Sequence, residues 1–206
     1  MRRLFILLIL LCSLCLPAFG EEGFALSFTP DGAGGMLIAG YTGVPEESLL
    51  LPEAAEGLPV TGIAEEALSG LAVDSLSLPR SIRTIGRGAL RDSTVREIRF
   101  SYGLAEIAEE AFAGCVNLVG CAFPETLVSV GDGAFDGCTS LLYVTLPESV
   151  SQLSGNPFSG CTVLESLPMV RNHPYFVVTD GALTARADGR VICTLAPMPA
   201  EETAGK

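Results

Sequence analysis

The 206-residue sequence contains no tryptophan, a single histidine (His173) and few positively charged side chains. It has 12 Lys and Arg residues but 24 Asp and Glu residues, which gives a net charge of −12. Binding to nucleic-acid phosphates requires clustered Lys and Arg, so we expect no nucleic-acid partner. The scarcity of histidine also disfavours most acid–base and metal chemistry.

Long apolar runs are absent beyond the first twenty residues. Arg2 and Arg3 precede a nearly apolar run over residues 4–16, and residues 18–20 (Ala-Phe-Gly) place small side chains before Glu21. A positive start, an apolar run and a small-residue exit are typical of a secretory signal peptide. The run is too short for a membrane span, which needs roughly 20 residues.

The alternative interpretation of this segment is a lipoprotein signal, in which Cys12 or Cys15 would be acylated. A leucine precedes each of these cysteines, where a small residue is normally required. We therefore predict a signal peptide over residues 1–20, a secreted or cell-surface location, and no membrane attachment after cleavage.

Internal repeats organise the rest of the sequence. Three segments of 23 residues, beginning at Phe100, Phe123 and Leu146, align without gaps, and residues 78–99 form the same unit with one deletion. Self-similarity at such a period indicates a repeat architecture. Five apolar columns run through these units and an earlier one; they begin at Ile63, Ala67, Leu68, Val73 and Leu76, and each recurs every 22 or 23 residues.

A single unit of this length cannot bury a core alone, but stacked units turn each apolar column into a continuous ladder. The alternation over residues 141–146 predicts a strand, and strands of successive coils would pair in parallel about 4.8 Å apart. Residues 131–135 (Gly-Asp-Gly-Ala-Phe) are expected to form a single helical turn or short helix. Residues 23–41 and 182–195 are interpreted as β-hairpins that cap the two open ends.

The motifs Leu146–Val150 and Gly131–Cys138 combine into the pattern L-P-x-S-V-x-x-I-G-x-x-A-F-x-G-C, which resembles the BspA-like class of leucine-rich repeat. The resemblance covers about residues 49–168, and residues 172–183 resemble the hairpin insert that these arrays often carry. It implies an α/β-type repeat solenoid of parallel strands and short helical turns. It also implies a secreted or surface protein, of a kind linked to adhesion and host recognition, with no shared catalytic residues.

We therefore predict five parts along the chain. They are a signal peptide (1–20), an N-terminal hairpin cap (21–48), a leucine-rich repeat array (49–168), a C-terminal hairpin (169–196) and a disordered tail (197–206). Pro197 and Pro199 mark the end of regular structure.

Cys115, Cys138 and Cys161 recur at intervals of 23 residues and are expected to form one inward column of small, reduced side chains. A metal site needs ligands that converge on one point, whereas this column spreads along the axis. A cysteine nucleophile needs a histidine nearby, and His173 lies next to Pro174, outside the regular array. We therefore predict no catalytic residue, no metal, no cofactor and no enzymatic activity.

Acidic residues occur in equivalent turns, directly after the column that begins at Ile63. A calcium-binding edge is one interpretation, but the sequence has neither EF-hand spacing nor a Gly-Gly-x-Gly-x-Asp repeat. We favour the other interpretation, a solvated acidic rim. The acidic residues are Glu65, Glu66, Glu109, Glu110 and Asp132.

The outward strand positions are the best candidates for partner binding. Among them, Glu97, Arg99, Tyr143 and Thr145 form our candidate face, because Tyr and Arg are favoured at binding hot spots. The leading hypothesis is a recognition module that binds a protein or glycan partner in adhesion or host interaction. The alternative is a structural spacer of the cell surface without a specific ligand. An exposed apolar patch on this face would favour recognition, and a uniformly polar face would favour the spacer.

Overall fold

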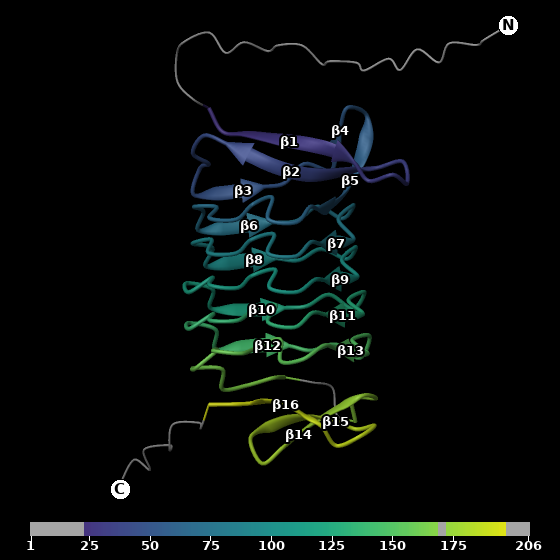
Figure 1. Ribbon diagram of the computed structural model, residues 1–206, viewed down its shortest axis with the longest axis vertical. Coiled ribbons are helices and arrows are strands. Elements are labelled where there is room, and N and C mark those ends of the chain that lie inside the picture. The colour runs from purple at the N-terminus through teal and green to yellow at the C-terminus, as the bar shows by residue number, and fades with distance from the viewer. Residues whose placement is uncertain (1–22, 169–171, 197–206) are drawn as a thin grey trace, which may run out of the picture.

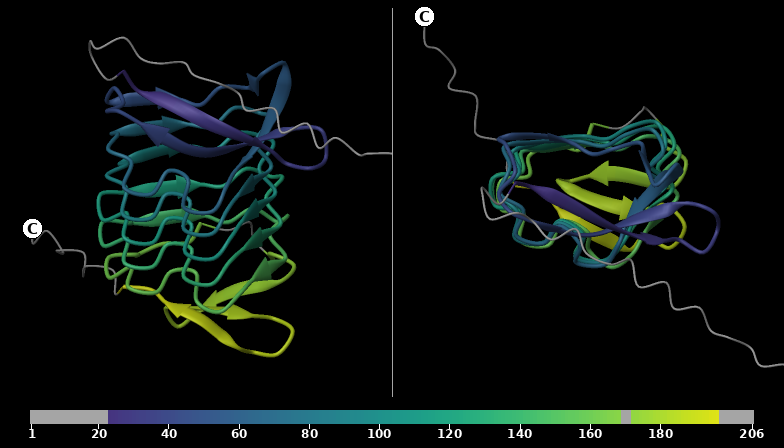
Figure 2. Two further views of the ribbon diagram at one scale, coloured as in Figure 1. Left: turned by 45° about the horizontal axis from the view of Figure 1, so that its top comes forward. Right: turned by 90° about the horizontal axis from the view of Figure 1, so that it is seen from above.

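A computed structural model describes residues 23–168 and 172–196. These residues form an elongated stack of coils, with a β-hairpin at one end and a small sheet at the other (Figure 1). Viewed along the stack, the coils nearly superpose (Figure 2). The architecture is a β-solenoid of about five turns. The predicted signal peptide and tail lie outside the described residues.

An eight-stranded sheet runs along one side of the solenoid. β1 and β2 pair in an antiparallel manner, the strands from β2 onward pair in parallel, and β4 (Ala54–Ala55) adds to β5 in an antiparallel manner. The strands along the sheet are, in order, β1 (Ala25–Pro30), β2 (Met36–Thr42), β5 (Leu58–Ile63), β7 (Thr84–Ile85), β9 (Glu106–Ile107), β11 (Ser129–Val130) and β13 (Gln152–Leu153).

Two further sheets complete the fold. A parallel five-stranded sheet consists of β3 (Ser48–Leu50), β6 (Ser75–Ser77), β8 (Glu97–Arg99), β10 (Gly120–Ala122) and β12 (Tyr143–Thr145), and its strands follow one another in chain order. At the C-terminal end, β14 (Phe176–Thr179), β15 (Ala182–Ala185) and β16 (Val191–Thr194) form an antiparallel three-stranded sheet.

Parallel pairing places equivalent residues of successive coils side by side. Gly62, Thr84, Glu106, Ser129 and Gln152 form one such row along the eight-stranded sheet. Every member of the five predicted apolar columns is buried inside the solenoid. The predicted stack of about 23-residue units with parallel strands is thereby confirmed.

The prediction of short helical turns, and with it the α/β class, is wrong, because the described residues contain no helix. Along residues 66–71, the odd-numbered residues donate their N–H groups to carbonyls three positions earlier, at 3.1–3.3 Å, and the even-numbered residues donate to the next coil, at 2.7–2.9 Å. Glu66 and Gly70 also adopt positive φ angles of 55° and 70°, which interrupt a right-handed helix. Accordingly, no helix in this part of the chain is long and apolar enough to cross a membrane.

The C-terminal end contains one strand more than the hairpin predicted over residues 182–195. β15 and β16 form that hairpin, and β14 pairs with the other edge of β15. Asp180 and Gly181, with φ angles of 51° and 71°, close the tight turn between β14 and β15. An Asp-Gly pair with positive φ at both positions is the usual chemistry of a two-residue hairpin loop.

Candidate functional site

The four predicted site residues lie on the outer face of the five-stranded sheet. Glu97 and Arg99 are on β8, and Tyr143 and Thr145 are on β12. All four are exposed, whereas the central residue of each of these strands is buried. β10 lies between β8 and β12, so the two pairs share one continuous face.

The Tyr143 ring is the most prominent feature of this face. Gly120 on β10 pairs directly with Tyr143, and a Cβ atom added to Gly120 would collide with the ring. The ring therefore lies over the glycine backbone, an arrangement in which an aromatic side chain covers a strand glycine. Tyr143 is still 45 % exposed. The strand supports one side of the ring, and solvent contacts the other.

The two halves of the face differ in polarity. Next to Tyr143, Leu142 is 41 % exposed, and β10 contributes only the small outward residues Gly120 and Ala122. Toward the N-terminus, β6 contributes serines and β8 contributes charged residues. The face is therefore not uniformly polar, because one end carries an aromatic and aliphatic patch.

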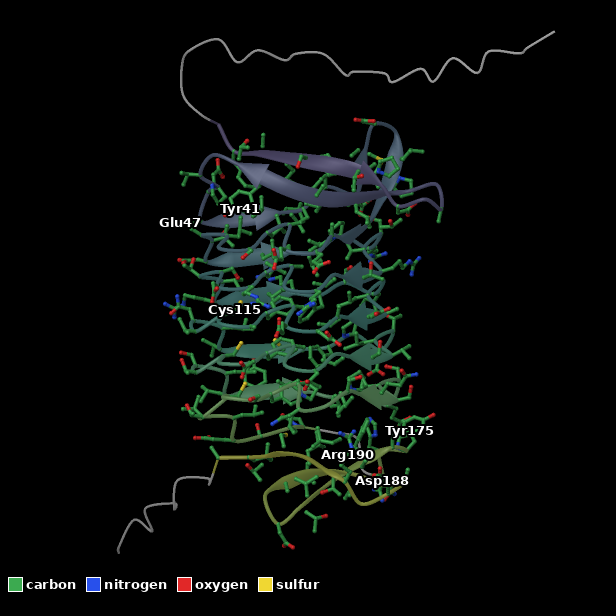
Figure 3. All side chains as sticks on the ribbon, in the orientation of Figure 1. Tyr41, Glu47, Cys115, Tyr175, Asp188 and Arg190 are labelled. Carbon is green, nitrogen blue, oxygen red and sulfur yellow. The ribbon has the colours of Figure 1, made fainter. Side chains whose placement is uncertain are left out.

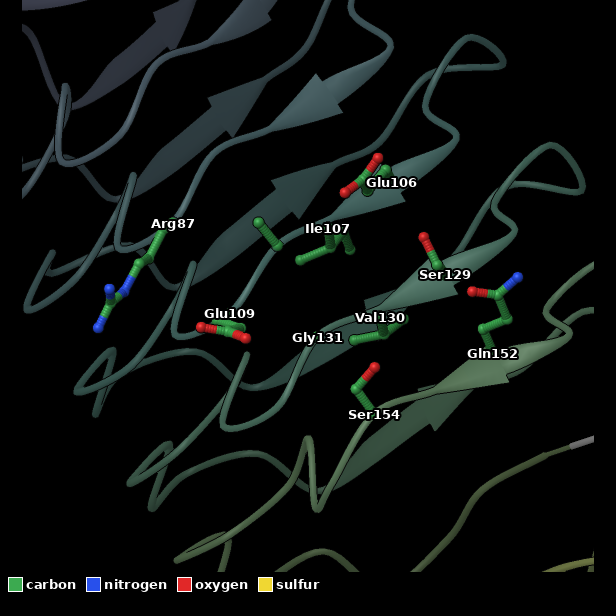
Figure 4. A pocket seen from close by; sticks show the side chains of 10 residues that line it. Arg87, Glu106, Ile107, Glu109, Ser129, Val130, Gly131, Gln152 and Ser154 are labelled. Carbon is green, nitrogen blue, oxygen red and sulfur yellow. The ribbon is translucent and has the colours of Figure 1, made fainter.

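A polar hollow of about 320 Å³ lies over the other sheet, and our sequence analysis missed it (Figure 4). Glu106, Ser129 and Gln152 line it from β9, β11 and β13, and Arg87 and Glu109 line it from the turns after β7 and β9. The sequence feature that could have predicted this hollow is the outward row of mostly polar residues that precedes the column beginning at Ile63 in the repeat alignment. Because the hollow combines positive and negative side chains, its charge selects no ligand class.

The repeats match the family described as the BspA type leucine-rich repeat region, in six copies over residues 61–176. The chain belongs to this family. The match covers more than half of the sequence and confirms the resemblance carried by the Leu-Pro and Gly-Cys motifs. No curated protein matches the chain.

Solved leucine-rich repeat structures show the same fold. A leucine-rich repeat protein of T. pallidum is 36 % identical, with a TM-score of 0.64 over 72 % of this chain and 71 % of that one. A leucine-rich cell surface protein of Faecalibacterium prausnitzii is 27 % identical, with a TM-score of 0.63 over 71 % of this chain and 38 % of that one. A leucine-rich repeat protein of Bacteroides ovatus, at 24 % identity and a TM-score of 0.60 over 73 % of this chain, shares the fold. This chain spans less than half of the last two proteins, at 38 % and 42 % of their lengths.

The described cysteines of this leucine-rich repeat protein are all free and buried. Three of them form the predicted inward column, and each thiol donates to a backbone carbonyl of the preceding coil. The donors and acceptors are Cys115 to Leu90 at 3.1 Å, Cys138 to Phe112 at 3.2 Å and Cys161 to Phe135 at 3.1 Å (Cys115 is labelled in Figure 3). Burial raises the pKa of Cys161 to about 12 and that of Cys193 to about 11, so these two thiols are neutral near pH 7.

His173 is buried against the last coil, whereas the sequence placed it in a turn outside the array. Its Nε2 lies 2.9 Å from the Pro147 carbonyl oxygen, and its Nδ1 accepts the N–H groups of Tyr175 and Phe176, both at 3.3 Å. With Nε2 as the donor, both ring nitrogens are used in holding the C-terminal sheet onto the array. His173 is therefore a structural residue.

The acidic rim is partly neutralised by arginines of the preceding coil. Glu110 is paired with Arg91, and Arg87 Nη2 lies 3.8 Å from Glu110 Oε2. Across residues 23–168 and 172–196, no group of three or more His, Cys, Asp and Glu side chains could hold a metal ion. Glu110 thus links two coils through ion pairs.

Proposed function

We propose that this protein is a secreted or cell-surface recognition module that binds a protein or glycan partner through the outer face of its five-stranded sheet. The observation that carries the proposal is the Tyr143 ring, which lies on Gly120 with Leu142 exposed beside it. A ring already held by the strand loses little conformational freedom on binding, which favours affinity. Arg99 supplies a charged contact on the same face.

The location rests on two supports. The first twenty residues carry the features of a secretory signal peptide. The similar F. prausnitzii protein is described as a cell surface protein. Leucine-rich repeat proteins of this family are generally non-enzymatic, and the proposed module has no catalytic step.

Binding of the chain from Glu21 onward to extracellular-matrix proteins and cell-wall glycans, immobilised in an array, tests the proposal. We expect Tyr143→Ala to weaken the strongest interaction by about ten-fold or more, which corresponds to about 1.4 kcal/mol. Arg99→Ala should weaken it less. Tyr102→Ala is the matched control, because Tyr102 is 73 % exposed in the loop between β8 and β9, and it should bind like the wild type.

Circular dichroism of each variant checks that the fold is kept. Wild-type affinity in both the Tyr143 and the Arg99 variants would refute the assigned face. The absence of any partner across the array would instead support the spacer function.

A further inference from the structure

A groove of about 730 Å³ separates the last coil from the C-terminal sheet. One wall is the edge strand β13 with its flanking residues, 151–155. The other wall comprises residues 174–176 and 185–187 together with Arg190. Tyr175 and Arg190 mark this region in Figure 3. Unlike the surfaces over the sheets, the groove is lined by residues outside the repeat as well as within it.

The charge of the groove is opposite to that of the chain. Arg186 and Arg190 line it, and no carboxylate does, although the sequence has a net charge of −12. Asp188 lies between them in the β15–β16 turn, where its carboxylate accepts the backbone N–H of Arg190 at 3.0 Å. The hollow over the eight-stranded sheet, by contrast, balances Arg87 with Glu106 and Glu109. The groove therefore complements an anionic ligand.

Arg190 holds the edge of β13. Its Nη2 donates to the Leu153 carbonyl at 3.1 Å, and its Nη1 donates to the Gly155 carbonyl at 3.3 Å. In the preceding coil, the carbonyl equivalent to that of Leu153, on Val130, accepts an N–H from the next coil. Because Arg190 replaces that donor, this edge does not offer these two carbonyls to an added peptide strand.

Arg186 is fixed without using its full donor capacity. Its Nε donates to the His173 carbonyl at 2.8 Å and the Phe176 carbonyl at 3.1 Å. Among the described residues, no hydrogen-bond partner is found for its two Nη groups. Two parallel N–H donors on a rigid guanidinium match the two oxygens of a carboxylate.

The remaining lining residues match a sugar. Tyr175 is 48 % exposed, and its ring packs against the rings of His173 and Phe176, with centroids 6.4 Å away in both cases. An aromatic ring offers an apolar face to the C–H groups of a sugar ring. Gln152 and Ser154 are exposed on the opposite wall and offer an amide and a hydroxyl to sugar hydroxyl groups.

We propose that this groove binds a carboxylated sugar, a uronic or sialic acid residue of a glycan. Arg186 pairs with the carboxylate, Tyr175 stacks on the sugar ring, and Gln152 and Ser154 bind hydroxyl groups. The site is separate from the Tyr143 face, so each can be tested without the other.

Amide NMR shifts of the isotope-labelled chain from Glu21 onward test this site, with oligogalacturonate and sialyllactose as probes. Lactose is the neutral control, and an oligoglutamate peptide is the acidic non-sugar control. We expect shifts confined to residues 151–155, 174–176 and 185–190. Lactose should bind at least about ten-fold more weakly than the two acidic sugars. Added salt should weaken the binding of the acidic sugars, since charge pairing contributes to it.

Three variants locate the interaction. Tyr175→Ala and Gln152→Ala change exposed side chains, and each should weaken acidic-sugar binding by about five-fold or more, while Tyr102→Ala, outside both proposed sites, should leave it unchanged. Arg186→Lys, which keeps the charge but loses the planar fork, should weaken it further.

The proposal is overturned if neither acidic sugar shifts these amides at about 10 mM, where a Kd of about 1 mM gives near saturation. It is equally overturned if lactose or oligoglutamate binds as tightly as the acidic sugars. Wild-type affinity in the Tyr175 and Gln152 variants would also contradict it, because the shifts would then arise elsewhere.

Discussion

Replacing Phe135 with alanine removes the central ring of an aromatic stack that runs along the solenoid axis. The ring is fully buried and lies 5.0 Å from Phe112, almost parallel to it at 5°, and 5.8 Å from Phe158 at 21°. Phe123 packs against it from the side, also at 5.8 Å. Truncating a buried phenylalanine costs about 3–5 kcal/mol, because transfer free energy is lost and a cavity remains.

This loss is a large part of the total stability of a domain, which is about 5–15 kcal/mol. For a chain of this size, each kcal/mol lowers Tm by about 2–4 °C, so we expect Phe135→Ala to lower Tm by roughly 6–20 °C. Phe135→Leu is a graded control, because Leu68 and Leu90 occupy the same column in earlier coils and are fully buried. It should cost about 1–2 kcal/mol.

Urea denaturation followed by far-UV circular dichroism measures both variants beside Tyr102→Ala, whose side chain is exposed. The exposed control should stay within about 0.5 kcal/mol of the wild type. If Phe135→Ala lost less than about 1 kcal/mol, or melted like Tyr102→Ala, the inward assignment of this column would be wrong.

The other expectations concern the thiols and the turns. In the chain from Glu21 onward, a thiol-labelling reagent used without reductant should modify few cysteines in the native state and five in the urea-unfolded state. Labelling of only one or three cysteines in the unfolded chain would reveal disulfides. Since the pKa of Cys161 is about 12 and that of Cys193 about 11 in the folded state, against 9.0 for an ordinary thiol, only the unfolded chain ionises them just above pH 9. The free energy of unfolding should then fall with rising pH, by up to about 1.4 kcal/mol per unit per thiol between pH 9 and 11, and urea melts of Cys193→Ala should show a shallower slope. Asp92 has a φ of 57°, a left-handed backbone conformation that glycine adopts with less strain. Asp92→Gly should therefore raise the free energy of unfolding by about 0.5–1 kcal/mol, and a lower urea midpoint than that of the wild type would contradict this strain argument. His173→Ala leaves the Pro147 carbonyl without its side-chain donor and should cost about 1–3 kcal/mol in the same melts, whereas wild-type stability would show that the ring does not hold the C-terminal sheet.

The inward columns could be predicted because a repeat presents each position several times. Cys121 and Pro157 are unusual members of their columns, yet their neighbours along the column identify them as inward, and both are buried. The helical turn was predicted wrongly because residues 131–135 were considered as a local segment. What decides their conformation is the hydrogen bonding of alternate N–H groups to the next coil, and those acceptors are backbone carbonyls without a sequence signature.

The candidate sites, too, were predictable where the repeat pattern marks them and unpredictable where they depend on backbone carbonyls distant in sequence. Alternation along the strands placed Tyr143 and Arg99 outward, as found. The cover of Tyr143 over Gly120 could have been inferred too, since both residues occupy one outward column in successive units. The contacts of Arg186 and Arg190 could not be inferred from the sequence. Their partners are backbone carbonyls 10–37 positions away, and no residue pattern marks such carbonyls.

The end of the array explains why the arginine-lined groove occurs where it does. Along the eight-stranded sheet, the last carbonyl of each strand accepts a backbone N–H from the coil that follows, as Val130 does from Ser154, so the matching carbonyl of the last coil, on Leu153, needs another donor. The Arg190 guanidinium supplies that donor to Leu153, and the His173 ring bonds to the Pro147 carbonyl of the same coil. A guanidinium bonded to neutral carbonyls keeps its positive charge. Capping a solenoid with arginine therefore concentrates positive charge at one end of an acidic chain, beside the edge where the repeat surface stops and a ligand of different chemistry can bind.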